Sequence, residues 1–303
     1  MSNLTALTIA AARDGLKKKQ FSALELTDAY LAAMEKARVL NAYIVETPEK
    51  ARDMAKASDA KLAAGQGGAL EGIPLGIKDL FAVKGVPTTW GSADFKDQIA
   101  DIDSEVVVRL RDAGAVLLAK LATGLFAQND WWFGGRTNNP WNTNIGSSGS
   151  STGPGSATAA GCVAFSIGTE TQGSIVSPAI RNGISALRPT YGRVSRHGGM
   201  VLAWSMDRVG PMCRTAEDCA MVFSVLHGVD EKDASTVTMP FQFDRNLGAP
   251  PPPHSASNNN GCFVATAPTT IGFDQQHSSF NYCNSSIMEP VGGGQSLLPI
   301  VDH

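Results

Sequence analysis

The residues best suited to chemistry lie in two loops of serine and glycine within the stretch 146–189. The first loop covers 146–153 and leads into a run of small residues compatible with a helix. The second covers 168–174 and leads into another short helix, and a serine opens each junction between loop and helix. A serine hydroxyl becomes a nucleophile when a neighbouring base accepts its proton. This order of loops, apolar runs and serines predicts an active-site frame.

Other uses of serine-glycine loops fit this stretch less well. A flexible linker does not alternate with apolar runs such as 162–165 and 184–187, which are typical of core strands. A phosphate-binding loop requires the ending G-K-[ST], which this stretch lacks. Residues 149–153 match the G-x-S-x-G elbow of hydrolases, but that motif directly follows a strand. The preceding residues 141–144 are typical of a loop, so the match is interpreted as chance.

One lysine interrupts the apolar run 73–80. Lys78 is flanked by Gly72, Pro74 and Gly76 on one side and by Asp79 on the other. A lysine at a strand edge can extend its amine to water, but the neighbouring glycines and the aspartate favour a position in the interior.

These motifs and their spacing resemble the amidase signature family of serine hydrolases. The family's G-x-S-S-G-G-like loop corresponds to 149–153, and its G-[ST]-[DE]-x-G-G-S loop corresponds to 168–174. The likeness continues through 187–195 and 207–211 and extends upstream to 72–79, so that it covers roughly residues 5–244. The resemblance implies the family's α/β fold, in which helices flank a mixed, largely parallel sheet, and it implies no metal or organic cofactor.

The family's Ser–Ser–Lys triad carries over residue by residue. Ser174 corresponds to the nucleophile, Ser150 to a bridging serine that follows a cis peptide bond in the family, and Lys78 to the base. Lysine accepts a proton only when it is neutral, and burial lowers its pKa. Ser150 can relay the proton because one hydroxyl donates and accepts at once, and the same relay protonates the departing amine.

Substrate-binding groups are also implied by the resemblance. The expected oxyanion hole consists of the backbone N–H groups of Thr171, Gln172, Gly173 and Ser174. Gln128 and Trp132 are the expected substrate-binding side chains. Trp132 belongs to the aromatic loop 129–135, which is interpreted either as a core plug or as an apolar wall for the acyl group.

Three positions depart from the family pattern. Thr152 stands where glycine is usual, Gln172 replaces the first glycine of G-G-S, and Val176 replaces an arginine common after the nucleophile. Since the triad positions are all present, we expect these changes to alter substrate choice more than reaction type.

Local patterns predict the elements that position these residues. Ser22 and Glu25 form a capping box that opens a helix. Helices are expected over 4–18, 22–37, 48–64, 104–113, 156–161 and 215–227, and strands over 42–45, 73–80, 116–119, 162–167 and 184–187. The alternation of strand and helix argues for an α/β fold. His197 and His227 are isolated and are interpreted as surface or packing residues.

The composition of the chain restricts the binding partners and the cellular compartment that we expect for it. A net charge of −3 offers no basic footprint for nucleic acid or an anionic membrane. No apolar run approaches the ~18 residues of a membrane span. Five cysteines without a C-x-x-C pair argue for reduced thiols, and the positive cluster 17–19 follows the apolar start, opposite to a signal peptide. We expect a cytoplasmic protein that binds a small-molecule amide, with a homodimer left open.

The character of the sequence changes after residue 245. Residues 246–303 contain no lysine or arginine and include runs of proline, asparagine and glycine, a composition typical of disordered segments. We therefore expect a truncated amidase signature domain over 1–245 and a low-complexity, disordered tail over 246–303 that contributes no packing.

Three functions stay open. The leading one is an amidohydrolase that cleaves a linear carboxamide through a serine acyl-enzyme. The second is the glutaminase (A) subunit of the tRNA-dependent amidotransferase, because 4–84 resembles that branch. Against it, the E-F-A-M-type loop of the branch reads L-F-A-Q at 125–128, and the aromatic loop suits a hydrophobic acyl group. The third is an inactive fragment, because the last third of the family pattern is missing.

Overall fold

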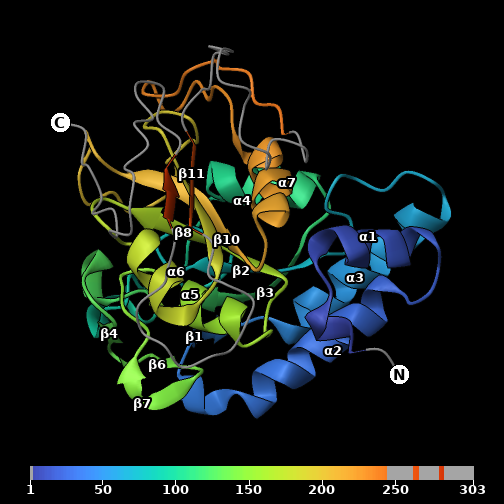
Figure 1. The fold of residues 1–303 in the computed structure, drawn as a ribbon, viewed down its shortest axis with the longest axis horizontal. Coiled ribbons are helices and arrows are strands. Elements are labelled where there is room, and N and C mark those ends of the chain that lie inside the picture. The colour runs from blue at the N-terminus through green and yellow to red at the C-terminus, as the bar shows by residue number, and fades with distance from the viewer. Residues whose placement is uncertain (1–2, 244–261, 266–279, 283–303) are drawn as a thin grey trace, which may run out of the picture.

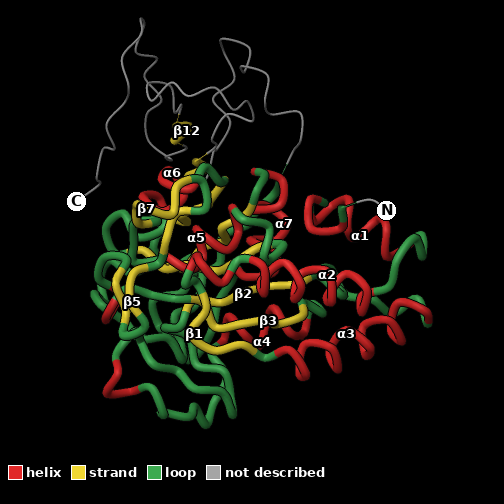
Figure 2. The backbone as a smooth tube through the Cα atoms, turned by 90° about the horizontal axis from the view of Figure 1, so that it is seen from below, coloured by secondary structure: helices red, strands yellow, loops and turns green. Residues whose placement is uncertain are grey.

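A mixed eight-stranded sheet forms the centre of the molecule, and helices lie on both of its faces (Figures 1 and 2). The computed structural model describes residues 3–243, 262–265 and 280–282. The helices are α1 (Ile9–Lys17), α2 (Ala23–Lys36), α3 (Pro48–Ala63), α4 (Glu105–Asp112), α5 (Thr152–Ala159), α6 (Val176–Asn182) and α7 (Ala216–Leu226). Short 3₁₀ turns are η1 (Leu4–Ala6), η2 (Arg38–Leu40), η3 (Ala93–Phe95) and η4 (Leu125–Ala127).

The sheet has the strand order β1-β3-β2-β8-β10-β9-β11-β12. Its strands are β1 (Tyr43–Glu46), β2 (Pro74–Lys78), β3 (Val116–Leu121), β8 (Phe165–Glu170), β9 (Ser185–Pro189), β10 (Arg208–Cys213), β11 (Cys262–Ala265) and β12 (Phe280–Tyr282). Two short ribbons lie apart from it, formed by β4 (Trp131–Trp132) with β5 (Gly135–Arg136) and by β6 (Asn138–Asn139) with β7 (Asn142–Gly146).

The central strand β2 pairs in parallel with β3 and β8, whereas the other pairings in the sheet are antiparallel. The predicted class, a mixed sheet flanked by helices, is confirmed. The expectation of a largely parallel sheet is corrected, because parallel pairing is confined to β3-β2-β8. The cause lies in the connections: α6 carries the chain from β8 to β9, and β10 then returns through the long loop 190–207 and inserts between them.

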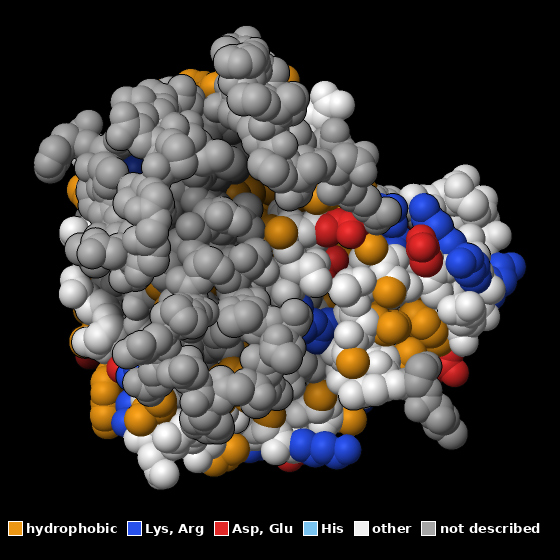
Figure 3. All heavy atoms as spheres, in the orientation of Figure 1, with side chains coloured by type: hydrophobic (Ala, Val, Ile, Leu, Met, Phe, Trp, Pro, Cys, Tyr) orange, Lys and Arg blue, Asp and Glu red, His pale blue; other side chains and the backbone are white. Residues whose placement is uncertain are grey.

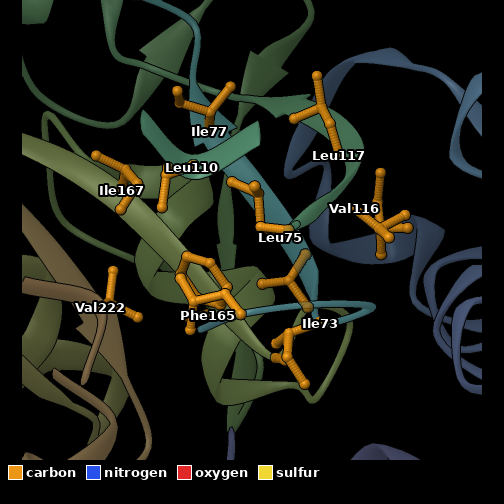
Figure 4. Packing of buried hydrophobic residues seen from close by; sticks show 14 of the residues in the cluster. Ile73, Leu75, Ile77, Leu110, Val116, Leu117, Phe165, Ile167 and Val222 are labelled. Carbon is orange, nitrogen blue, oxygen red and sulfur yellow. The ribbon is translucent and has the colours of Figure 1, made fainter. Parts of the chain in front are cut away.

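Successive side chains of β2 and β8 point to opposite faces of the sheet, so that one face is apolar and the other is polar. Figure 4 shows the side chains of Leu75, Ile77, Phe165 and Ile167 together with those of α4 and α7. The intervening positions face α5 and the first serine loop. A Cβ at Gly168, for example, would lie 2.8 Å from the hydroxyl oxygen of Ser151. The polar face is therefore the one on which serine chemistry can be assembled.

Local capping explains where the N-terminal helices begin. The Ser22–Glu25 capping box is present as predicted, with the Ser22 N–H donating to Glu25 at 2.8 Å and the Glu25 N–H donating to Ser22 at 3.0 Å. The helix expected over 4–18 is instead divided into η1 and α1. Thr8 has extended backbone angles and its hydroxyl accepts the Ala11 N–H, so it acts as an N-cap that starts α1 anew.

Three boundaries near the serine loops were predicted wrongly. Helix α5 begins at Thr152 rather than at 156, and β8 covers Phe165–Glu170 rather than 162–167, so that the expected loop 168–174 begins inside a strand. A short apolar run does not distinguish a strand from a buried turn, and 162–164 form the buried turn. Of the residues 141–144 expected as loop, 142–144 lie in β7, because this segment pairs with β6.

The outer edge of β9 is paired with β11, which lies in the expected tail. The backbone of β11 and β12 thus extends the sheet, contrary to the expectation that this segment contributes no packing. The remainder of 246–303 lies outside the described residues.

None of the described helices is long and apolar enough to cross a membrane. Figure 3 shows Lys, Arg, Asp and Glu side chains interspersed over the N-terminal helices.

Candidate active site

Lys78, at the end of β2, is fully buried and surrounded by oxygen atoms of the serine loops. Its Nζ lies 2.8 Å from Ser150 Oγ, 3.0 Å from Ser151 Oγ and 2.8 Å from Thr169 Oγ1, and the Thr169 carbonyl accepts from it at 3.4 Å. No carboxylate in the described chain forms an ion pair with it. Burial lowers the pKa of Lys78 well below that of a free lysine, against the opposing charges of Asp207 and Glu170.

A second buried lysine shows the contrasting arrangement. Lys120 on β3 is also fully buried, but its Nζ lies 2.6 Å from the Asp79 carboxylate and 2.9 Å from the Thr88 hydroxyl. Burial lowers the pKa of Lys120 too, and the adjacent Asp79 opposes that shift. Lys120 is thus one half of a buried ion pair, whereas Lys78 has neutral partners suited to a neutral amine.

Ser150 is buried and follows a cis peptide bond from Gly149, as the family resemblance implies. Its carbonyl accepts the Gly124 N–H at 3.2 Å. Glycine is required at 149 because a Cβ there would lie 1.7 Å from the Asn129 carbonyl oxygen. The loop that carries Asn129 therefore lies directly against the backbone that positions Ser150.

Ser174 is half-buried in the turn between β8 and α6. Its carbonyl accepts the Ser151 N–H at 3.1 Å, which fixes its backbone beside the first serine loop. Gly173 precedes it with φ of +90°, in the left-handed region that glycine adopts without strain. Within residues 3–243, the Ser174 hydroxyl forms no hydrogen bond, so it is available to a substrate.

The turn that carries Ser174 leaves four successive amides without partners. The N–H groups of 171–174 donate to no acceptor among the residues that the structure describes. The next two, Ile175 and Val176, donate to the Glu170 carboxylate at 2.8 and 2.9 Å, and Arg188 pairs with that carboxylate at 2.9 Å. Glu170 therefore holds the turn and leaves the preceding amides free to bind a developing oxyanion.

Asp207 joins this turn to a second loop. It accepts the Thr171 hydroxyl, and its other oxygen accepts the N–H groups of Leu202 and Ala203 at 2.6 and 3.1 Å. The turn 171–174 is thereby fixed from both sides, by Glu170 and by Asp207.

A cavity of about 500 Å³ adjoins the two serine loops. It is lined by Asn129, Asp130, Ser148, Gly149, Ser177, Ile180 and Arg181. The two expected substrate-binding side chains do not line it. Gln128 is exposed beside it, and the Trp132 indole packs against Phe133 and donates to the Asn41 carbonyl at 3.2 Å. Their role in substrate binding stays a prediction.

Some residues of the site were not anticipated from the sequence. Ser151 and Thr169 contact Lys78 directly, and their places beside Ser150 and within the second loop were the available signal. Lys120 interrupts an apolar strand just as Lys78 does. Of the departures from the family pattern, Thr152 is accommodated by a hydrogen bond between its hydroxyl and that of Ser147, and Gln172 is exposed.

The histidines and acidic side chains form no metal centre in the part of the chain that the structure describes. The His227 ring packs 5.4 Å from the Phe223 ring, in agreement with the predicted packing role.

Known proteins resemble this chain in sequence and in fold. The sequence model of the family "Amidase" matches residues 25–261. The A subunit of the glutamyl-tRNA(Gln) amidotransferase of Rhodopseudomonas palustris (strain BisB18) is 49% identical over 245 residues, which are 78% of this chain and 50% of that protein. The protein of the same name from Nitrobacter winogradskyi is 47% identical over 245 residues, with the same coverage.

Among solved structures, the peptide amidase from Stenotrophomonas maltophilia superposes with a TM-score of 0.74 at 35% identity, covering 78% of this chain and 51% of that one. The chain thus spans about half the length of the relatives that it matches.

Proposed function

This chain belongs to the amidase family, and from that premise we propose that it is an amidohydrolase that cleaves the C–N bond of a linear carboxamide. Ser174 is the nucleophile, Ser150 the relay and Lys78 the base. The amides of 171–174 are the oxyanion donors. The amidase signature domain is proposed to cover 1–245, with β11 as an added strand at the edge of its sheet. The compartment is proposed to be the cytoplasm.

The proposed reaction moves one proton through the buried hydroxyl relay. The Ser174 Oγ attacks the amide carbon while its proton passes to Ser150 and the Ser150 proton passes to neutral Lys78. When the tetrahedral intermediate collapses, the C–N bond breaks and the proton returns through Ser150 to the departing nitrogen. Water then attacks the acyl-enzyme through the same relay, which yields the carboxylic acid and regenerates Ser174.

The observation that carries this proposal is the environment of Lys78. The Lys78 amine is fully buried, lies within 3.0 Å of two serine hydroxyls and has no carboxylate partner among the described residues. Burial holds its pKa well below that of a free lysine, which favours the neutral form that can draw a proton from Ser150. A purely structural lysine would be paired as Lys120 is with Asp79.

Replacement of Ser174 tests the proposal directly. Ser174→Ala should abolish amide turnover and labelling by a fluorophosphonate, since the attacking oxygen is removed, and should leave the melting temperature nearly unchanged. Ser224→Ala, at an exposed serine of α7, is the matched control. Labelling of the Ser174→Ala chain at the wild-type rate would contradict the assignment.

The second candidate is the glutaminase component of an amidotransferase, which the identity of 49% to such a protein favours. In that case the chain should release ammonia from glutamine, and the rate should rise when the other amidotransferase components are added. Hydrolysis of simple amides at a rate independent of those components would favour the stand-alone amidohydrolase.

A further inference from the structure

A second cavity lies on the apolar face of the sheet, on the side opposite to the serine loops. It has a volume of about 450 Å³ and lies between α3 and α4. Its floor is formed by Leu75 and Ile77 of β2 and by Leu117 of β3, whose side chains appear together in Figure 4. Successive residues of a strand point to opposite faces, so Ile77 lines this cavity while the next residue, Lys78, contacts the serine loops. The cavity is therefore separate from the candidate active site.

Helix α3 runs along the whole floor and sets its length. Thr47, just before the helix, donates its N–H to the Leu118 carbonyl at 2.9 Å, and the Ser58 hydroxyl donates to Glu71, just before β2, at 2.7 Å. From Lys50 to Ser58, which both line the cavity, eight residues at about 1.5 Å each cover about 12 Å. The three floor side chains are no more than 6% exposed. A helix, about 10 Å wide with its side chains, is too broad to reach them, whereas a single alkyl chain is slender enough.

The end of the cavity near the start of β2 is polar but already satisfied. The Glu71 carboxylate is buried there, and it accepts the Ser58 hydroxyl and the Gly68 N–H at 2.7 and 2.9 Å. The Lys61 ammonium group lies 3.8 Å from the same carboxylate. This end therefore offers no free charge to a ligand.

The opposite end carries two positive charges without partners. Its acidic residue, Asp103, accepts the backbone N–H of Lys84 at 2.8 Å and forms an ion pair with Arg111. The ammonium groups of Lys50, in the first turn of α3, and of Lys84, in the loop after β2, form no hydrogen bond or ion pair within residues 3–243. Four basic residues thus line the cavity against two acidic ones, and both acidic ones are paired.

We propose that this cavity binds a linear alkyl carboxylate of medium chain length, such as decanoate. The carboxylate pairs with Lys50 and Lys84, and the alkyl chain lies along Leu75 and Leu117 toward the start of β2. An extended chain advances about 1.2 Å per bond, so about ten bonds fill the 12 Å of floor. An alkylammonium ion would bring a third positive charge to the same end, which is unfavourable. The proposal does not depend on the proposed function, because it involves no hydrolysis.

The length and the charge of the ligand test the proposal by binding to the full wild-type chain. In titration calorimetry with hexanoate, octanoate and decanoate, the affinity should rise about tenfold for each two methylene groups that become buried. Decylammonium should bind more weakly than decanoate. An affinity that does not rise with chain length, or one that is higher for decylammonium, would overturn the proposal.

Filling the cavity locates the alkyl chain. Ala57 lines the cavity and is exposed, so Ala57→Phe should occupy its space without disturbing the core, and should weaken decanoate binding at least about tenfold. Ala60→Phe, at an exposed alanine of the same helix that does not line the cavity, is the matched control. Undiminished decanoate binding by Ala57→Phe would place the ligand elsewhere and overturn the proposal. So would the absence of decanoate binding together with a change of sedimentation in Ala57→Phe, because the cavity would then be a contact between copies of the chain.

Two lysine variants test the recognition of the carboxylate. Lys50→Met and Lys84→Met should each lower the affinity for decanoate about two- to fivefold, the range for partly exposed ion pairs, and should leave the affinity for decan-1-ol unchanged. Lys56→Met, on the surface of α3 and outside the cavity, is the control. An equal loss of affinity for decanoate and decan-1-ol would show that these lysines act by packing and not by charge, and would overturn the carboxylate assignment.

Discussion

The proposed mechanism needs a neutral Lys78, and the burial that lowers the pKa of this lysine also lowers the stability of the fold. Between the lowered pKa in the folded chain and the 10.5 of an ordinary lysine, the unfolded chain binds one proton more than the folded chain. Stability therefore rises with pH across that window.

Lys78→Met should thus raise the melting temperature at pH 7 while it abolishes activity, since methionine fills the space without a proton to lose. The gain should shrink as the pH approaches 10.5, where the unfolded lysine is also neutral. Thermal melts at pH 7 and pH 10 check this, with Lys56→Met on the surface of α3 as control. A variant less stable than the wild type at pH 7 would show that Lys78 is charged in the folded chain.

Lys78→Arg distinguishes a neutral base from a simple positive charge. Arginine stays protonated at any working pH, so this variant should be as inactive as Lys78→Ala in an amide hydrolysis assay. Activity above one tenth of the wild type would contradict a neutral-lysine base.

Glu170, at the junction between β8 and α6, both holds the backbone of that junction and acts on the pKa of Lys78. Its carboxylate accepts two N–H groups at the start of α6, and its negative charge raises the pKa of Lys78 against the larger effect of burial. Removing the charge while keeping an acceptor separates these two effects, because glutamine can still accept one hydrogen bond through its amide oxygen.

Glu170→Gln should therefore lower the pKa of Lys78 further and shift the acid limb of kcat/KM toward lower pH. Arg188, which pairs with Glu170, reduces the size of the shift. The pH profile is compared with that of Glu49→Gln, an exposed position in the first turn of α3. A shift toward higher pH would mean that Glu170 acts on some other group.

Elements with local signals were predictable, and those set by tertiary contacts were not. The Ser22 capping box, the Thr215 N-cap of α7 and the interior position of Lys78 follow from a few neighbouring residues. The start of β8 does not, because the apolar run already begins at 162 and only the pairing with β2 shows that the strand begins at Phe165. Likewise, Arg181 and Asp130 lie far apart in sequence, and the fold alone brings them to one cavity.

At the scale of the whole molecule, the sheet continues past β9 into the segment that composition alone assigned to a tail. β10 pairs with β9 only at Ser185 and Ala186, whereas β11 pairs with it from Ala186 to Pro189. The second half of β9 therefore has β11 as its main hydrogen-bonding neighbour. Without β11, this half would be an open edge, the kind of backbone that recruits strands from other molecules.

A chain ended after residue 243 should therefore lose protection in β9 and associate more readily with itself, although composition alone predicted a tail over 246–303 that contributes no packing. Amide hydrogen exchange of a peptide covering 184–190 should be faster in the shortened chain, because its outward N–H groups lose their acceptors on β11. A peptide covering 73–79 is the internal control, since β2 keeps both neighbours. Equal protection of 184–190 in the two chains would show that β11 does not hold this edge in solution, and would restore the interpretation of 246–303 as a segment that adds nothing to the sheet.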